Sequence, residues 1–519
     1  MTITSFHALL LTIPQIVPQG QDYVRILPEI VLSIFGIAVM LLDPIVDEER
    51  GPRTAGVVAF IGTLAAFVAT WFMAQSPGFA FSNMVRVDSF SVFFHVLVIA
   101  IAAVVILSSF EYLSVQRIRA GEFYALILFG TVGIALMSSA VELVLIFISL
   151  EISSISTYIL AGFRRHEAAS SESSLKYFLL GSFATAFFLY GVAMMFGATG
   201  STNIDTISHT LQASPAQPLV FVAIALMFVG LGFKVAAAPF HVWTPDVYEG
   251  APAPVVGFMS TAPKAAAFAV LLRILFAINA PGRFWLIWVV AALSMTLGNI
   301  GALVQTNVKR LLAYSSIAHA GYLLVAFAMT APDNSVPGIS AAMFYSASYA
   351  AMNVGAFAVV SHFASAGERY VTLEDYEGLG RTSPILAATL TIFLLSLIGI
   401  PMTGGFFAKF YVFSAALRAN LVGLTLIGVL NSAVGAYYYL RIIVVMYMRE
   451  PRKQVPVAPI PFGLGFALAV SIIATLYLGI LPNRVLQYAQ HSAQELLPQS
   501  SVQSPAVAAQ PRSFPQRGY

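Results

Sequence analysis

The sequence predicts an all-α protein that crosses a membrane many times. Apolar residues make up 59% of the 519 residues and charged residues only 9%, and the mean hydropathy is +0.85. Soluble domains carry about 25% charged residues. The apolar residues gather into long runs, and a bilayer core about 30 Å thick needs roughly 20 of them per helical span. A nucleic-acid-binding protein is excluded, because the chain has no basic run with interleaved aromatic residues.

About fourteen such runs follow one another along the chain. The start, MTITSFHALLLTIPQIVPQG, has no basic region of the kind that opens a signal peptide, so the first span is expected to direct insertion. The approximate spans are 25–43, 54–75, 88–110, 121–138, 141–163, 175–197, 218–238, 253–278, 283–305, 311–330, 338–364, 383–414, 421–447 and 460–481.

Basic residues predict the orientation of these spans. Lys and Arg near span ends stay cytoplasmic, and loops after odd-numbered spans hold 14 of them against 3 after even-numbered spans. Both termini are therefore expected on the non-cytoplasmic side. The 14 are Arg50, Arg53, Arg117, Arg119, Arg164, Arg165, Lys176, Lys309, Arg310, Arg369, Arg381, Arg449, Arg452 and Lys453, and the 3 are Arg86, Arg283 and Arg418.

Cofactor-binding patterns are not found in the sequence. The absence of cysteine excludes disulfides, thiolate-bound zinc and iron–sulfur ligation within the chain. Histidines and carboxylates do not recur at metal-ligand spacing on one helix, and no glycine loop of the phosphate-binding or dinucleotide-binding type is present. Any redox cofactor is expected in a partner protein.

Four ionisable residues fall well inside apolar spans: Glu151, Lys234, Lys264 and Lys409. Each such group costs about 2.5 to 3.5 kcal/mol at the centre of a bilayer, so it normally faces a protein interior or water and marks an ion pathway. A static ion pair is the structural alternative for Glu151, and a lysine that extends to the membrane surface is the alternative for the lysines. Four in one chain favour an ion pathway.

Two of these lysines stand beside helix-breaking residues. Lys234 lies in GLGFKVAAAP and Lys409 ends GIPMTGGFFAK. Proline removes a helical hydrogen bond, and a broken membrane helix is tolerated where it lines a cavity or meets buried partners. Corresponding interruptions in two halves are typical of transporters built from repeats. Because the two sites are five spans apart, the repeats are expected to be inverted, with helices 7 and 12 discontinuous.

Two histidines are suited to proton relay, because the free imidazole titrates near neutral pH. His241 lies in APFHVWTP and His319 in AYSSIAHAGY. Lys264 follows Pro263 in span 8, between the two interrupted spans, and completes the set of candidate proton-transfer residues.

Long strings of the chain resemble a known family. HVWTPDVYEGAPAPVVGFMSTAPKAA (241–266), QTNVKRLLAYSSIAHAGY (305–322) and NSAVGAYYYLRIIVVMY (431–447) resemble the antiporter-like membrane subunits of complex I, the proton-pumping NADH-quinone oxidoreductase. LPEIVL (27–32) and TGGFFAKFYVF (403–413) favour the subunit N branch. The resemblance extends to about residue 482.

This resemblance implies fourteen helices, with spans 4–8 and 9–13 as two inverted five-helix repeats. It also implies that Glu151 and Lys234 form a pair and that protons move along these two residues, Lys264 and Lys409. Lysine at 409 suits subunit N, because the related subunit M carries glutamate there. A long lateral C-terminal helix, which subunit L would have, is not expected.

The function implied is proton translocation coupled to electron transfer from NADH to quinone. NADH, FMN, iron–sulfur clusters and quinone would sit in partner subunits, with none in this chain. The expected partners are subunit M, small membrane subunits and lipids, in a bacterial inner membrane. The alternative is the large subunit of a multi-subunit Na⁺/H⁺ antiporter or of a membrane-bound hydrogenase. A self-contained secondary transporter is a more distant alternative.

Five segments are predicted. The last is a tail rich in Gln, Ser, Pro and Ala, a composition that is typical of flexible chains. The segments are 1–118 with three N-terminal helices, 119–280 as the first repeat, 281–448 as the second, 449–482 with the last helix, and 483–519 as the flexible polar tail.

Overall fold

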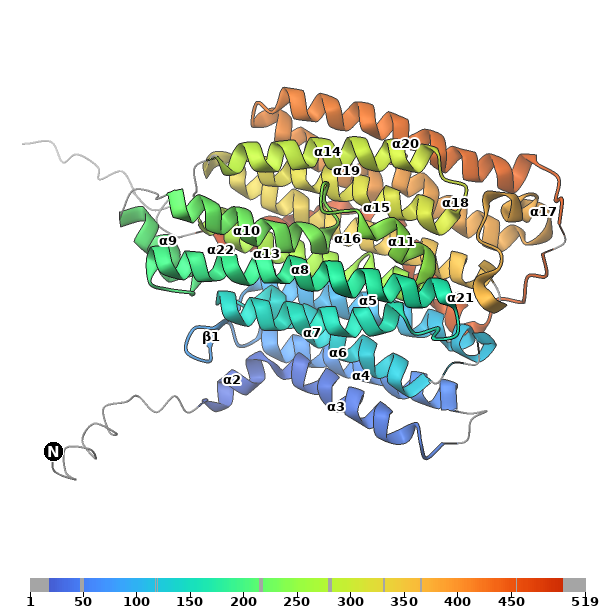
Figure 1. Ribbon diagram of the computed structural model, residues 1–519, viewed down its shortest axis with the longest axis horizontal. Coiled ribbons are helices and arrows are strands. Elements are labelled where there is room, and N and C mark those ends of the chain that lie inside the picture. Colours follow the sequence, from blue (N-terminus) through green and yellow to red (C-terminus); the bar gives the residue numbers. More distant parts are fainter. Residues whose placement is uncertain are drawn as a thin grey trace, which may run out of the picture.

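The helices of this protein run side by side in one large bundle (Figure 1). The computed structural model describes residues 18–497, apart from 47–50, 117, 119, 214–217, 279–281, 330–331, 365 and 454. At one edge of the bundle lie α3 (Leu27–Leu42) and α4 (Gly51–Ala74), and at the opposite edge lie α14 (Arg283–Leu303) and α20 (Val422–Met448). The all-α fold class predicted from the sequence is confirmed.

Short elements cover the two ends of the bundle, and the longer helices cross it. A two-stranded antiparallel hairpin follows α4. The remaining elements are α2 (Gly20–Arg25), β1 (Gly78–Ala80), β2 (Val85–Val87), α5 (Ser89–Gln116), α6 (Ala120–Ser139), α7 (Leu143–Ala161), α8 (Ala168–Thr199), α9 (Ile204–Ala213), α10 (Pro218–Val235), α11 (Trp243–Gly250), α12 (Ala253–Met259), α13 (Ala262–Ala277), α15 (Val308–Val325), η1 (Ala326–Ala328), α16 (Pro332–Ala364), η2 (Ala366–Glu368), η3 (Leu373–Tyr376), α17 (Leu379–Thr382), α18 (Pro384–Ile398), α19 (Gly404–Arg418), α21 (Phe462–Ile480) and α22 (Pro482–Leu496).

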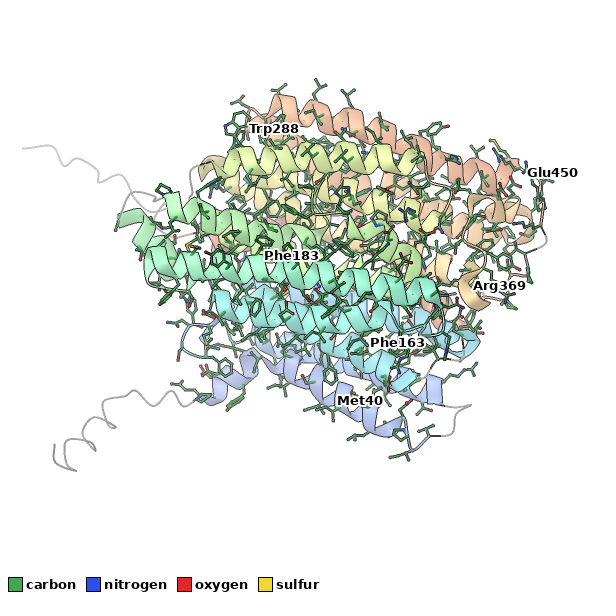
Figure 2. The ribbon with its side chains drawn as sticks, in the orientation of Figure 1. Met40, Phe163, Phe183, Trp288, Arg369 and Glu450 are labelled. Atoms are coloured by element: carbon green, nitrogen blue, oxygen red, sulfur yellow. The ribbon has the colours of Figure 1, made fainter. Side chains whose placement is uncertain are left out.

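The helices match the spans expected from hydropathy. Among the described residues, 12 helices are long and apolar enough to cross a membrane, and two shorter apolar helices, α3 and α18, occupy two further predicted ranges. Large apolar side chains such as Met40 and Phe183 are exposed on the flanks, whereas Arg369 and Glu450 lie at one end (Figure 2). Exposed apolar flanks between polar ends suit a lipid environment.

Both interruptions predicted beside the lysines are present. The first lies between α10 and α11, where Ala236 has a φ of 60°. The second lies between α18 and α19, where Gly399 has a φ of 94°. Glycine reaches this left-handed region without the steric cost of a Cβ atom, which is why it so often ends helices.

A third interruption was not predicted. The sequence indicated one continuous span over 253–278, but Ser260 and Thr261 separate α12 from α13. Pro263 explains the break, because its ring cannot follow a continuous helix without meeting the carbonyl four residues earlier. Lys264 comes directly after this proline, so all three membrane lysines lie close to a helix interruption.

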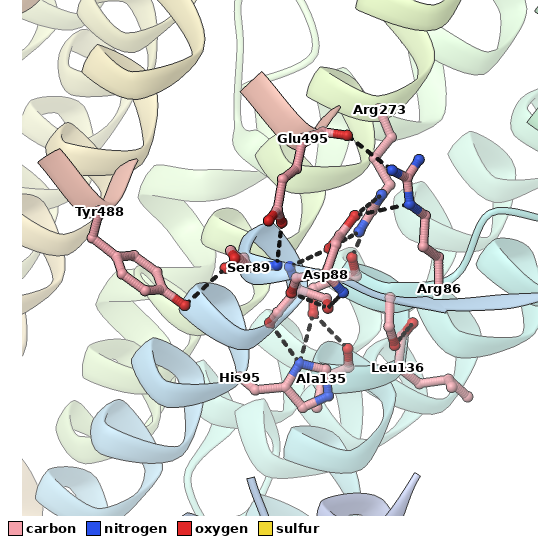
Figure 3. A network of polar contacts seen from close by, with 12 residues as sticks. Arg86, Asp88, Ser89, His95, Ala135, Leu136, Arg273, Tyr488 and Glu495 are labelled. Atoms are coloured by element: carbon pink, nitrogen blue, oxygen red, sulfur yellow. Dashed lines mark hydrogen bonds and ion pairs between the residues drawn. The ribbon is translucent and has the colours of Figure 1, made fainter. Parts of the chain in front are cut away.

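The expectation of a flexible tail from residue 483 was wrong for its first part, which forms α22. This helix packs against α5 and α16. Its Glu495 carboxylate accepts a hydrogen bond from the Ser89 backbone N–H at 2.8 Å, and its Tyr488 hydroxyl donates to the Ser89 carbonyl at 3.3 Å (Figure 3). The composition of this segment is polar on average, but its residues alternate as in an amphipathic helix, and its apolar face buries Ala489 and Ala493. Residues 498–519 lie outside the described part of the chain.

A buried ion pair joins α13 to the start of α5. The Arg273 guanidinium donates to both Asp88 carboxylate oxygens, at 2.9 and 3.1 Å (Figure 3). Burial by itself would raise the pKa of Asp88, but Arg273 and Arg86 together lower that pKa below its ordinary value. Nearby, the His95 Nε2 atom lies 2.8 Å from a Glu29 carboxylate oxygen, which links α5 to α3.

The Glu368 carboxylate contacts residues from four separate segments of the chain, at the end of the bundle where Arg369 lies. Its carboxylate accepts hydrogen bonds from the Tyr112 hydroxyl at 2.8 Å, the Ala253 backbone N–H at 2.7 Å and the Lys309 amine at 2.6 Å. Arg164 adds an ion pair at 3.6 Å. Burial by itself would raise the pKa of Glu368, but Lys309 and Arg164 lower that pKa below 4.5, its ordinary value.

We expect the Glu368 cluster to stabilise the fold in a pH-dependent way. Because folding lowers the pKa of Glu368, its contribution is complete above pH 4.5 and is lost as the pH falls through the lower folded value. Glu368→Gln should cost about 3–5 kcal/mol at pH 7, since it leaves Lys309 buried without a counter-ion, and should weaken the acid sensitivity. Thermal unfolding of the solubilised chain between pH 7 and pH 3 measures both effects.

The matched control for this experiment is Glu374→Gln. Glu374 is exposed in the same connection, so its substitution should change stability by no more than about 0.5 kcal/mol. Equal losses in the two variants would show that the cluster does not hold the connection.

We expect the interruption in span 12 to depend on Gly405. A Cβ atom there would lie 1.8 Å from the Ser396 carbonyl oxygen, so α18 and α19 would have to move apart. Gly405→Ala should therefore destabilise the chain by about 1–3 kcal/mol or more. Gly423→Ala, where a Cβ meets no atom within 4 Å, should leave stability unchanged or raise it by up to about 1 kcal/mol. An equal decrease in the unfolding temperature of Gly405→Ala and of Gly423→Ala would contradict this account.

Candidate functional site

The three predicted lysines are buried in the interior of the bundle. Lys234 and Lys264 are each 3% exposed, and Lys409 is 8% exposed. Glu151 is half-buried on α7. The structure thus places three amines out of contact with solvent, where each needs hydrogen-bond acceptors from the protein.

Lys234 is held by a hydroxyl group. Its amine donates to the Ser154 Oγ atom at 3.0 Å and lies 5.7 Å and 5.9 Å from the ring centres of Tyr177 and Tyr158. Ser154 follows Glu151 by three residues on α7, so both face the same side of that helix. The expected Glu151–Lys234 pair is not a direct contact: no ion pair within 4.0 Å joins them, and the Glu151 Oε1 atom is buried without a hydrogen-bond partner.

Lys264 is also held by a serine. Its amine donates to the Ser316 Oγ atom at 2.5 Å and lies 3.5 Å from the Ser316 carbonyl oxygen. The Tyr349 hydroxyl donates to the same Oγ atom at 2.8 Å. Ser316 therefore connects the amine of α13 to a tyrosine of α16.

His319 extends this set of polar groups toward α20. Its Nδ1 atom lies 2.7 Å from the Tyr345 hydroxyl, and its Nε2 atom lies 3.2 Å from the Tyr439 hydroxyl. A cavity of about 20 Å³ is lined by Lys264, His319, Tyr345 and other side chains. A polar cavity holds a water molecule from roughly 10–15 Å³ upward, so one water fits between the amine and the imidazole.

Lys409 is held by the end of a broken helix. Its amine donates to the carbonyl oxygens of Leu397 and Ile398, at 3.0 and 2.8 Å, and to the Ser432 Oγ atom at 2.8 Å. These carbonyls belong to the last turn of α18 and lack helical partners. The carbonyl end of a helix also carries partial negative charge, which attracts a cation. The interruption thus creates the amine's binding site.

The two candidate relay histidines differ. His319 lies between Lys264 and Lys409 and interacts electrostatically with both. His241 is half-buried in the connection after α10, and its Nδ1 atom is buried without a hydrogen-bond partner. In the described part of the chain, His241 makes no hydrogen bond to the candidate lysines or to Glu151.

Sequence reasoning missed the hydroxyl groups that hold the amines. Ser154 and Ser316 each lie three residues from a predicted site residue on the same helix, Glu151 and His319, and that spacing was a usable signal. Ser432 had no such signal, because only the packing of α20 against α19 brings it to Lys409. Over the described residues, no group of three or more His, Cys, Asp or Glu side chains could hold a metal ion.

Comparisons with known proteins agree with the fold. Residues 140–435 match the model of the NADH:quinone oxidoreductase/Mrp antiporter transmembrane family. NADH-quinone oxidoreductase subunit N 2 of Koribacter versatilis is 67% identical, over 92% of this chain and 98% of that protein. A chain of respiratory complex I from Thermus thermophilus matches with a TM-score of 0.76 and 37% identity, over 89% of this chain and 98% of that one.

A more distant structure shares the fold. A chain of the Mrp complex from Dietzia matches with a TM-score of 0.79 at 21% identity, over 92% of this chain and 97% of that one. At this identity the match is informative about architecture only. With the high identity over nearly its full length and the family match across the buried lysines, the chain belongs to the NADH-quinone oxidoreductase subunit N family of antiporter-like membrane subunits.

Proposed function

We propose that this chain is a proton-translocating membrane subunit of a respiratory NADH-quinone oxidoreductase. Protons would move through Glu151, Lys234, Lys264 and Lys409, with His319 as a relay. Electron transfer from NADH to quinone would take place in partner subunits, which would hold FMN, the iron–sulfur clusters and the quinone.

One observation carries this proposal: among the described residues, the four buried lysines fall into two groups. Lys309 contacts a buried carboxylate at 2.6 Å, as the buried Arg273 does at 2.9 Å. Lys234, Lys264 and Lys409 contact hydroxyl or carbonyl oxygens, and none has a carboxylate within 4.0 Å among the described residues.

This difference separates structural charges from exchangeable ones. A carboxylate at contact distance stabilises the charged amine and holds its proton. Neutral oxygens can accept a hydrogen bond from an amine whether or not it carries its extra proton. The three lysines are therefore placed so that a proton can arrive and leave without breaking an ion pair.

The cavity supplies one step of the proposed route. A water molecule in the space between Lys264 and His319 would pass a proton from the amine to the imidazole. His319 contacts Tyr439, which also hydrogen-bonds Ser315. A change of charge in a neighbouring subunit would act at Glu151 and alter its long-range attraction to Lys234.

The proposed setting is the inner membrane of a bacterium, with both termini on the non-cytoplasmic side and with subunit M and small membrane subunits as neighbours. The distribution of basic residues supports this orientation. The identity to subunit N favours this assembly over a Na⁺/H⁺ antiporter or a membrane-bound hydrogenase. Affinity purification in mild detergent tests it. Flavin and iron–sulfur subunits should copurify, whereas small antiporter subunits alone would contradict the proposal.

We expect Lys264→Ala to stop most proton translocation while the complex still assembles. General acid–base groups contribute about 10²–10⁴-fold, so translocation should fall to about one hundredth or less. Lys264→Arg should fail similarly, because a guanidinium does not release its proton near neutral pH. Proton uptake into inverted vesicles and NADH-quinone reductase activity measure the effect.

The control for this experiment is Lys453→Ala. The Lys453 side chain is 60% exposed and pairs with Asp375, far from the three buried lysines in the sequence. The Lys453→Ala complex should retain normal proton translocation. An assembled Lys264→Ala complex that pumps at the wild-type rate would rule out the proposed route.

We expect Ser316→Ala to slow translocation several-fold, because it removes the hydroxyl that joins Lys264 to Tyr349. A neutral hydrogen bond contributes about 0.5–1.5 kcal/mol, which corresponds to roughly a two- to tenfold change. Ser346→Ala enlarges the same cavity but removes only a bond to the Ala342 carbonyl of its own helix. The initial rate of proton uptake should fall in the first variant only. An equal loss of proton-uptake rate in Ser316→Ala and Ser346→Ala would show that cavity size, and not the lost hydroxyl, causes the effect.

A further inference from the structure

A long apolar groove lies between α5, α16 and α21, and α22 lies across one end of it. Its volume is about 590 Å³, within the range of about 300–1,000 Å³ that is typical of ligand sites. The groove exists because α16 presents Ala347, Ala350 and Ala351 to it, three small side chains on one helical face. Opposite them lie aliphatic side chains of α5 and α21, such as Val96 and Val470.

The dimensions of the groove match one leaflet of a bilayer. Its lining on α5 runs from Val92 to Val104, a rise of about 18 Å at 1.5 Å per residue. Half of a hydrocarbon core about 30 Å thick is about 15 Å. Val96 is 45% exposed and Val470 is 38% exposed, so the groove is open along the lipid-facing side of the bundle.

The end of the groove under α22 carries a positive charge. Arg484 lines the groove there together with Tyr488. Arg484 makes no hydrogen bond or ion pair with any residue in the described part of the chain, in contrast to Arg86 and Arg273 nearby, which both contact Asp88. The exposed Arg484 guanidinium at the polar end of this apolar groove is therefore free to pair with an anion.

Polar contacts hold this end of the groove in place. Tyr488 and Glu495 of α22 both bond the Ser89 backbone at the start of α5, and the Arg86 guanidinium donates to the Glu495 carbonyl at 2.8 Å (Figure 3). The Tyr488 ring also stacks on Phe93, with ring centres 6.4 Å apart. An amphipathic helix at the end of a membrane bundle is suited to the level of lipid headgroups.

We propose that the groove binds one acyl chain of an anionic phospholipid, with the lipid phosphate paired to Arg484. The apolar lining accommodates the chain, and the guanidinium binds phosphate oxygens in the two-pronged geometry that arginine favours. A quinone would fill the apolar part but would bring no charge for Arg484. This proposal does not depend on proton translocation.

Photocrosslinking tests the proposal on the intact complex. The purified complex is incubated with phosphatidylglycerol that carries a diazirine in one acyl chain, is irradiated, and is digested for mass spectrometry. Crosslinks should concentrate on peptides of α5, α16 and α21. Arg484→Gln should weaken labelling about tenfold, the effect of losing one charge-assisted hydrogen bond.

Two further variants make the test specific. Ala350→Leu should block the chain site and abolish labelling while the charge at the mouth remains. Arg418→Gln removes another exposed arginine, in the last turn of α19, and should label as the wild type does. Unfolding temperatures show whether each variant is folded.

Three outcomes would overturn the proposal. The first is equal labelling of wild type and Arg484→Gln, and the second is crosslinks spread over the outer faces of α8 and α20. The third is protection of the groove in the intact complex by a segment of a neighbouring subunit. Because the readout is lipid labelling, its failure is distinguishable from a failure of proton pumping.

Discussion

The structure depends on how a buried amine obtains hydrogen-bond acceptors inside a membrane. A continuous helix uses all of its carbonyl oxygens internally, so a lysine on it finds none nearby. The chain solves this problem in two ways. Lys409 uses the carbonyl end of α18, which the interruption at Gly399 leaves free. Lys234 and Lys264 use serine hydroxyls from neighbouring helices.

The same constraint separates the lysines of the proposed pathway from the charges that hold the bundle together. Lys309 and Arg273 are buried as deeply as the pathway lysines, but each contacts a carboxylate. Removing one partner of such a pair leaves an uncompensated charge, which costs about 3–5 kcal/mol. These pairs join helices that are distant in the sequence, such as α13 to α5 through Asp88. Lys234, Lys264 and Lys409 are not part of such pairs within the described residues.

Hydropathy and local residue chemistry predicted the spans, the buried lysines and two of the three interruptions, because these features depend on neighbouring residues. The break before Lys264 was missed, since Pro263 was its one local signal. The serine acceptors of the amines were missed. Ser154 and Ser316 were indicated only by their spacing from Glu151 and His319, and Ser432 reaches Lys409 only through the packing of α20 against α19. The pairing of Glu368 with Lys309 was missed for the same reason.

Helix dipoles make the free energy of a protonated lysine differ from one site of the proposed pathway to the next. Lys234 lies in the last turn of α10, and the Lys409 amine lies at the carbonyl end of α18, where the helix dipole attracts a cation. Lys264 is the third residue of α13, where the dipole of that helix repels one. The dipole at one helix terminus changes the free energy of a nearby cation by about 0.3–1 kcal/mol at exposed sites and by up to about 2 kcal/mol at partly buried sites. In the proposed pathway, Lys264 would therefore be the lysine from which a proton is most readily displaced, and it is also the lysine that lines the water-sized cavity.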